Sequence, residues 1–98
     1  MRYNLVFTEQ FNQDVAALYE ALAEYPSMAK RIFQEMERKL EGLKDNPFMW
    51  PTFHGSKYRR INLEGNALFY TVDEHEHEVR LYHLYYAKRD LLKLLGIE

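Results

Sequence analysis

Residues 57–86, KYRRINLEGNALFYTVDEHEHEVRLYHLYY, decide the fold because they contain three runs of strand-forming residues separated by short polar breaks. The runs are residues 57–63, 67–73 and 78–86. Glu64-Gly65-Asn66 separates the first two runs, and Glu74-His75-Glu76-His77 separates the second from the third. Connections this short favour an antiparallel meander of three strands.

The half of the chain before this stretch predicts one strand and two helices. Residues 3–7 favour a strand, and Thr8 follows as a helix N-cap. From Glu9 onward, apolar residues at spacings of four, three and four form one helical stripe: Phe11, Val15, Leu18 and Leu22. After Pro26-Ser27, which supplies an expected N-cap, a second stripe predicts a helix from about residue 27 to 45: Ile32, Met36, Leu40 and Leu43. Asn46-Pro47 ends it.

The order strand, helix, helix, three strands predicts one α+β domain over residues 1–98, with a helical hairpin packed on one face of a small, mainly antiparallel sheet. Residues 87–95 predict a terminal helical turn. Alternation along the strands assigns one set of side chains to the helices: Ile61, Leu63, Leu68, Tyr70, Val72, Tyr82, Leu84 and Tyr86. The opposite set is Tyr58, Arg60, Asn62, Phe69, Thr71, Leu81, His83 and Tyr85. This second set mixes aromatic residues with arginine and histidine, so we take it as the candidate functional surface.

Composition limits the possible functions. The chain contains 13 Lys or Arg, 15 Asp or Glu and no Cys, which excludes disulfides and thiol chemistry and gives no overall attraction to nucleic acid. Because the first residues lack the apolar core of a signal peptide, we expect a soluble cytoplasmic protein. The acidic excess lies in residues 1–50, with six basic and eight acidic side chains, so a local basic patch remains possible in residues 51–98.

Six short motifs, in this order, resemble the RelE/ParE superfamily of toxins from bacterial type II toxin–antitoxin systems. They are Phe7-Thr8, Ser27-x-Ala29, Leu43 with Asn46-Pro47, Tyr58-Arg59-Arg60-Ile61, Leu68-Phe69-Tyr70-x-Val72-Asp73 and Lys88-Arg89-Asp90. The resemblance covers nearly the whole chain and implies the α+β fold predicted above. It also implies a cognate antitoxin protein whose extended or helical segment wraps the toxin.

The resemblance leaves three functions open. RelE-like toxins are metal-independent endoribonucleases that cleave messenger RNA in the ribosome, whereas ParE-like toxins poison DNA gyrase without chemistry of their own. A non-toxic relative would act only as a protein-binding module. None of the three needs a cofactor or a metal, and His75 and His77 in their polar turn lack the further ligands that a metal would require.

If the chain is an RNase, the resemblance assigns roles to four residues. Arg60 and Arg89 match basic positions that hold phosphate, and His83 and Tyr85 are candidates for proton transfer. Lys57, Arg59 and Lys88 are further candidates for binding RNA phosphates. Two positions depart from the pattern: Asn62 stands where a lysine is common, and Ala67 where an arginine is usual.

Each of these candidates also has a structural interpretation. Lys57, Arg59 and Arg60 would protect an edge strand from aggregation, and Arg89 would pair with Asp90. His83 would be a half-buried strand residue. The three aromatic residues between residues 46 and 56 would form a lid over an edge of the core rather than stack on bases: Phe48, Trp50 and Phe53.

Overall fold

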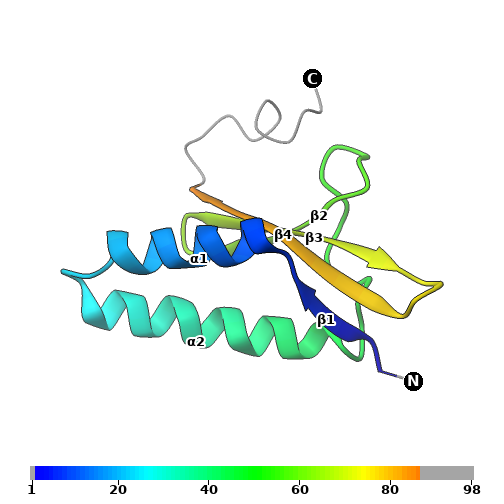
Figure 1. The fold of residues 1–98 in the computed structure, drawn as a ribbon, viewed down its shortest axis with the longest axis horizontal. Coiled ribbons are helices and arrows are strands. Elements are labelled where there is room, and N and C mark those ends of the chain that lie inside the picture. Colours follow the sequence, from blue (N-terminus) through cyan, green and yellow to red (C-terminus); the bar gives the residue numbers. More distant parts are fainter. Residues whose placement is uncertain (1, 87–98) are drawn as a thin grey trace.

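The computed structural model describes residues 2–86 and contains two helices packed against a four-stranded sheet (Figure 1). The elements are β1 (Asn4–Phe7), α1 (Glu9–Ala21), α2 (Pro26–Leu43), β2 (Arg59–Leu63), β3 (Asn66–Asp73) and β4 (Glu78–Tyr86). The strand order is β1-β4-β3-β2, in which β1 runs parallel to β4 and the other neighbours are antiparallel. The predicted α+β fold and element order are therefore confirmed. The terminal turn predicted over residues 87–95 lies outside the described residues.

The two helices begin in different ways. Thr8 caps α1 as predicted, because its hydroxyl accepts a hydrogen bond from the Phe11 backbone N–H at 3.1 Å. The N-cap predicted for α2 at Pro26-Ser27 is wrong: Tyr25 occupies that position without a side-chain bond, and Pro26 is the first helical residue. Proline suits this place because its missing N–H would have no helical partner there. Neither described helix has the length and apolar character that a bilayer crossing would require.

Both helices cover the same face of the sheet, which we call the helix-side face (Figure 1). Its core combines the apolar stripes of α1 and α2 with inward residues of β2, β3 and β4. The buried members are Phe11, Leu18, Leu22, Ile32, Leu40, Leu43, Ile61, Leu63, Leu68, Tyr70, Val79, Leu81 and Leu84. Every residue that defined the two predicted stripes is in this cluster or packs against it.

A β-bulge in β4 changes which side chains reach this core. Phe69 of β3 pairs with His83 of β4, but the next residue, Tyr70, pairs with Leu81, so Tyr82 is an extra residue without a cross-strand partner. As a result Leu81 is buried in the helix-side core, whereas Tyr82 contacts the ring of Tyr58, which lies on the other side of the sheet. The sequence alternation placed Leu81 and Tyr82 on the opposite faces, and both assignments are wrong because the bulge shifts the alternation by one residue.

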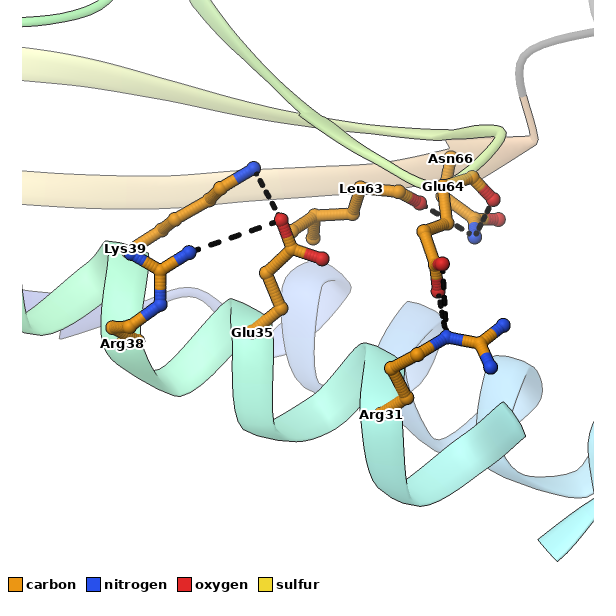
Figure 2. A network of polar contacts seen from close by, with 7 residues as sticks. All are labelled: Arg31, Glu35, Arg38, Lys39, Leu63, Glu64 and Asn66. Carbon is orange, nitrogen blue, oxygen red and sulfur yellow. Dashed lines mark hydrogen bonds and ion pairs between the residues drawn. The ribbon is translucent and has the colours of Figure 1, made fainter. Parts of the chain in front are cut away.

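Charged contacts fasten α2 to the turn between β2 and β3 (Figure 2). Nε of Arg31 lies 2.9 Å from both carboxylate oxygens of Glu64, and Lys39 bonds both to Glu35 and to the backbone carbonyl of Asn62, each at 2.8 Å. Inside the turn, the buried Asn66 side chain donates to the Leu63 carbonyl at 3.1 Å. These contacts fix the edge of the sheet that carries β2 against the helix.

Residues 46–58, which we call the aromatic loop, wrap around the β2 edge of the sheet. Thr52 forms an isolated bridge with Arg59, and the Arg60 N–H donates to the Pro51 carbonyl at 3.2 Å. At the start of the loop, the Tyr70 hydroxyl donates to the Pro47 carbonyl at 2.7 Å, and burial raises the pKa of Tyr70 to about 12. The loop is thus tied both to the core and to the edge strand.

Candidate functional site

The sheet face opposite the helices, which we call the loop-side face, is covered by aromatic side chains. Ala67 and Phe69 of β3 are fully buried there, beneath Phe53, Tyr58 and Tyr85. The Phe53 ring meets Phe69 edge-on at 5.2 Å between centroids, and the Tyr58 ring does so at 6.5 Å. The face that the sequence predicted to be partly open therefore has an aromatic cover over its centre.

The aromatic loop forms the lid that the sequence predicted, but over two surfaces rather than one. Phe53 packs on the loop-side face, while Trp50 packs against the helix-side core. Phe48 is 43% exposed and lies 5.0 Å from the guanidinium of Arg59. Phe53 and Trp50 thus close opposite sides of the same sheet edge.

The three basic residues predicted to bind phosphate between residues 57 and 60 make different contacts in the structure. Arg59 donates from Nη1 to the Trp50 carbonyl at 2.7 Å, so its side chain holds the aromatic loop in place. Lys57 places its ammonium 5.3 Å from the centre of the Tyr58 ring. Arg60 lies 5.4 Å from the Phe53 ring, and its Nε donates to Oδ1 of Asn62 at 2.8 Å.

Arg60 is the member of this group that is best placed for a ligand. Asn62 orients its guanidinium and the Phe53 ring lies against it, and neither terminal nitrogen donates a hydrogen bond to a described residue. Arg60 and Asn62 also line a pocket of about 290 Å³ whose other walls come from the aromatic loop. An arginine oriented in this way can offer paired N–H donors to a phosphate.

The structure brings His83 and Tyr85 together, as the prediction of a shared site requires. Their rings stack at 5.0 Å with an angle of 17° between the planes, and His83 lies 6.2 Å from Tyr58. His83 is directed toward this group by its pairing with Phe69, and the bulge at Tyr82, one residue earlier in β4, adds the Tyr82 ring to the group.

Asp14 of α1 is a member of this site that the sequence analysis missed. Its Oδ2 accepts the Leu84 backbone N–H at 3.1 Å and lies 4.0 Å from Nδ1 of His83. Its Oδ1 accepts a hydrogen bond from the Gln10 side chain at 2.9 Å. A signal was present in the sequence, because position 14 falls between Phe11 and Leu18 on the apolar stripe of α1, where a carboxylate is out of place.

The surroundings of His83 favour a neutral imidazole. Burial lowers the pKa of His83 below its ordinary value of 6.5, and the negative charge of Asp14 opposes part of that fall. Nδ1 is buried without a hydrogen-bond partner within bonding distance in the described part of the chain. A neutral imidazole near pH 7 can accept a proton, which is the property a general base needs.

Arg60 and His83 lie on the two strands that flank β3. Both are paired with Phe69, one through β2 and the other through β4, so their backbones are separated by two strand spacings, about 10 Å. The remaining two predicted residues, Lys88 and Arg89, lie outside the described residues. The described part of the site therefore consists of one oriented arginine, one histidine with its carboxylate, and an aromatic floor between them.

A second surface lies on the opposite edge of the sheet. Among the strands of residues 2–86, β1 pairs with β4 alone, so no described strand covers its other backbone edge. Beside it, a groove of about 790 Å³ runs between β1 and α2, lined by Leu5 and Phe7 from the strand and by Phe33, Met36 and Leu40 from the helix. Phe7 is 47% exposed at this groove. An open strand edge with apolar side chains next to it is suited to receive an extended peptide.

Comparisons with known proteins agree with this architecture. The family model described as ParE toxin of type II toxin-antitoxin system, parDE, matches residues 5–91. The structure of the chromosomal ParDE system from P. aeruginosa is similar with a TM-score of 0.71 and 15% identity, covering 89% of this chain and 98% of that chain. No curated protein sequence matches the chain.

Two RelE structures are similar to a comparable degree. The intact E. coli RelBE toxin–antitoxin complex gives a TM-score of 0.65 at 20% identity and covers 89% of this chain and 99% of that chain. An E. coli RelE mutant bound to a RelBc antitoxin peptide gives 0.68 at 19% identity, with coverage of 100% and 97%. At these identities the structural likeness establishes the fold, while the family model accounts for most of the sequence.

Proposed function

The chain belongs to the family of ParE toxins of type II toxin–antitoxin systems. From the groups gathered on its loop-side face, we propose that it is a cytoplasmic toxin that cleaves messenger RNA on the ribosome without a metal, as RelE-like toxins do. The observation that carries the proposal is the pairing of both Arg60 and His83 with Phe69, which puts them on the same sheet face, with Tyr85 stacked beside His83. A base, a cation and a phenol on one face are the groups that this reaction needs.

In this mechanism His83 takes the proton from a ribose 2′-hydroxyl. The 2′-oxygen forms a bond to the adjacent phosphorus, and the bond from phosphorus to the 5′-oxygen of the next nucleotide breaks. Tyr85 donates its proton to that leaving oxygen, so that a cyclic phosphate and a 5′-hydroxyl are produced. Arg60 stabilises the negative charge that develops on the phosphate, and Lys57, Lys88 and Arg89 add positive charge along the RNA.

The test is cleavage of messenger RNA in a purified translation system, with the 5′ ends of the products mapped by primer extension. His83→Ala is expected to lower the rate by about 10²–10⁴-fold, the usual contribution of a general base. Arg60→Ala is expected to lower it by about 10²–10³-fold. His75→Ala is the matched control, because the His75 side chain is 92% exposed in the turn before β4. Absence of cleavage by the wild-type protein would contradict the proposal.

Inhibition of DNA gyrase without chemistry is a second candidate, and the cover over the loop-side face favours it. Ala67 is buried beneath aromatic side chains. The resemblance to RelE implies an arginine at this position that contacts the RNA, so an RNase of this kind would lack one of its usual cations here. If this candidate is correct, purified gyrase incubated with DNA and the toxin accumulates cleaved DNA, and His83→Ala does not change the amount. The two assays together therefore separate the two targets.

We propose that the antitoxin binds along the groove between β1 and α2. An extended antitoxin segment would add a strand to the open edge of β1 and insert apolar side chains against Phe7, Phe33 and Met36. Phe7→Glu is expected to weaken binding of the antitoxin encoded in the neighbouring reading frame, measured by calorimetry. Met28→Glu is the control, since Met28 is 41% exposed and does not line the groove. Equal affinity of the two variants would place the antitoxin elsewhere.

A further inference from the structure

We infer that Asp14 is the positioning residue for His83: its carboxylate holds the imidazole in the tautomer that carries the proton on Nδ1 and leaves Nε2 as the base. The inference rests on the RNA-cleavage function proposed above, but its structural part can be tested separately. It assigns a role to a residue of α1 that lies outside the strands carrying the other members of the site.

The Asp14 carboxylate is itself firmly placed. Gln10, one turn earlier in α1, donates to Oδ1 at 2.9 Å, and the Leu84 backbone N–H donates to Oδ2 at 3.1 Å. The second bond is available because β1 ends at Phe7 and pairs with β4 only as far as Leu81. Beyond that point α1 lies alongside β4, and Asp14 provides the acceptor that a neighbouring strand would otherwise provide.

The position of the carboxylate selects one tautomer of His83. Oδ2 of Asp14 lies 4.0 Å from Nδ1, and Nδ1 is buried from water and has no hydrogen-bond partner among residues 2–86. A proton on Nδ1 is attracted by the carboxylate, whereas a lone pair there would be repelled by it. The distance is longer than a hydrogen bond, so the interaction in this structure is electrostatic, and small movements on RNA binding would shorten it.

No other described group competes for this role. The side chains that face the His83 ring from the remaining elements are Tyr58, before β2, and Tyr82 and Tyr85 of β4. None of these three side chains is a carboxylate that could attract a proton on Nδ1. Asp14 is the charged group that acts on the pKa of His83, and it acts to raise it. A carboxylate that orients an imidazole and stabilises its protonated form is the arrangement that activates histidine bases in other enzymes.

The first experiment measures the pKa of His83 by NMR in the wild-type protein, Asp14→Asn and Glu20→Gln. Asn keeps an oxygen for the Leu84 N–H but loses the charge, so the pKa of His83 is expected to fall. Glu20→Gln removes an exposed carboxylate from the same helix and is expected to leave it unchanged. An unchanged pKa in Asp14→Asn overturns the inference. If Asp14→Asn does not fold, Asp14→Ser takes its place, because its hydroxyl can still accept a hydrogen bond.

The second experiment measures the pH dependence of RNA cleavage. In Asp14→Asn the rate at the plateau is expected to fall by at least about tenfold, because the carboxylate that holds His83 in the required tautomer is lost. The acidic limb of the profile is expected to move to lower pH, together with the pKa of His83. If the rate falls but the acidic limb of the pH profile stays at the same pH, Asp14 has a merely structural role and the inference is overturned. If the wild-type protein cleaves no RNA, the proposed function fails, and the NMR titration still decides whether Asp14 and His83 are coupled.

Discussion

The helix-side face of the sheet buries residues from both helices and three strands in one apolar cluster, whereas the loop-side face buries Ala67 and Phe69 under three aromatic side chains. The side chains proposed to take part in catalysis all lie on the loop-side face: Arg60, His83 and Tyr85. The large core on the helix-side face provides most of the stability of the domain. On the loop-side face the aromatic layer is thin, so the polar side chains beside it can still contact a ligand.

The largest effect is expected from Phe11→Ala, which removes a ring that is 2% exposed from the helix-side core. We expect the free energy of unfolding to fall by about 3–5 kcal/mol, because α1 and β4 cannot close the resulting cavity. Urea denaturation followed by circular dichroism measures it. Tyr19→Ala on the same helix, with Tyr19 at 66% exposure, is expected to change stability by no more than about 0.5 kcal/mol. Similar losses in both variants would mean that the core is not where the stability lies.

Tyr70→Phe is expected to have the next largest effect, a loss of about 1–3 kcal/mol in the free energy of unfolding, since it leaves the buried Pro47 carbonyl without its donor.

Tyr70 also makes the stability of the protein depend on pH in the alkaline range. The pKa of Tyr70 is raised from 10.0 to about 12, so the unfolded chain loses this proton first, and stability falls as pH rises from about 10 toward 12. Denaturation at pH 7 and above pH 10 should show that this alkaline loss is smaller in Tyr70→Phe. Tyr25→Phe, at an exposed site, is the control.

Phe53→Ala tests the loop-side face. We expect a loss of about 1–2 kcal/mol, less than for Phe11, because the Phe53 ring is partly exposed and packs on the small cluster around Phe69 rather than inside the larger core. The fluorescence of Trp50, the single tryptophan of the chain, reports on the loop during unfolding. Phe48→Ala in the same loop should cost less, since Phe48 is 43% exposed. A loss as large as that of Phe11→Ala would show that the two faces contribute equally.

The helix-side face could be predicted from the sequence far better than the loop-side face. Helical stripes depend on a local period, and the residues of both stripes lie in or against the core. The faces of β4 depend on an unbroken alternation, and one extra residue at Tyr82 moved Leu81 to the core. No local pattern marks the position of that bulge, because it is set by the pairing with β3.

Three side chains of the candidate site could be placed on one face from the sequence, but their partners could not be predicted. His83, Tyr85 and Arg60 lie on one face as expected, whereas Arg59 is used to hold the aromatic loop. Asp14 reaches His83 from 69 residues earlier in the chain, which spacing along a strand or helix cannot reveal. The one available signal was a carboxylate on an apolar stripe, and such a residue is buried only when it has partners.

The smallest effect is expected at the junction of α2 with the β2–β3 turn, where the helix-side face ends (Figure 2). Arg31→Ala removes an ion pair whose side chains are 59% and 38% exposed, so we expect a loss between 0 and about 1 kcal/mol that shrinks further in 0.5 M salt. Asn66→Ala in the same turn removes a donor that is buried and uncharged, and we expect about 1–3 kcal/mol with no dependence on salt. Urea denaturation of both variants at low and high salt makes the comparison. A larger loss for Arg31→Ala than for Asn66→Ala would mean that the exposed charges, rather than the buried amide, hold this edge of the sheet against the helix.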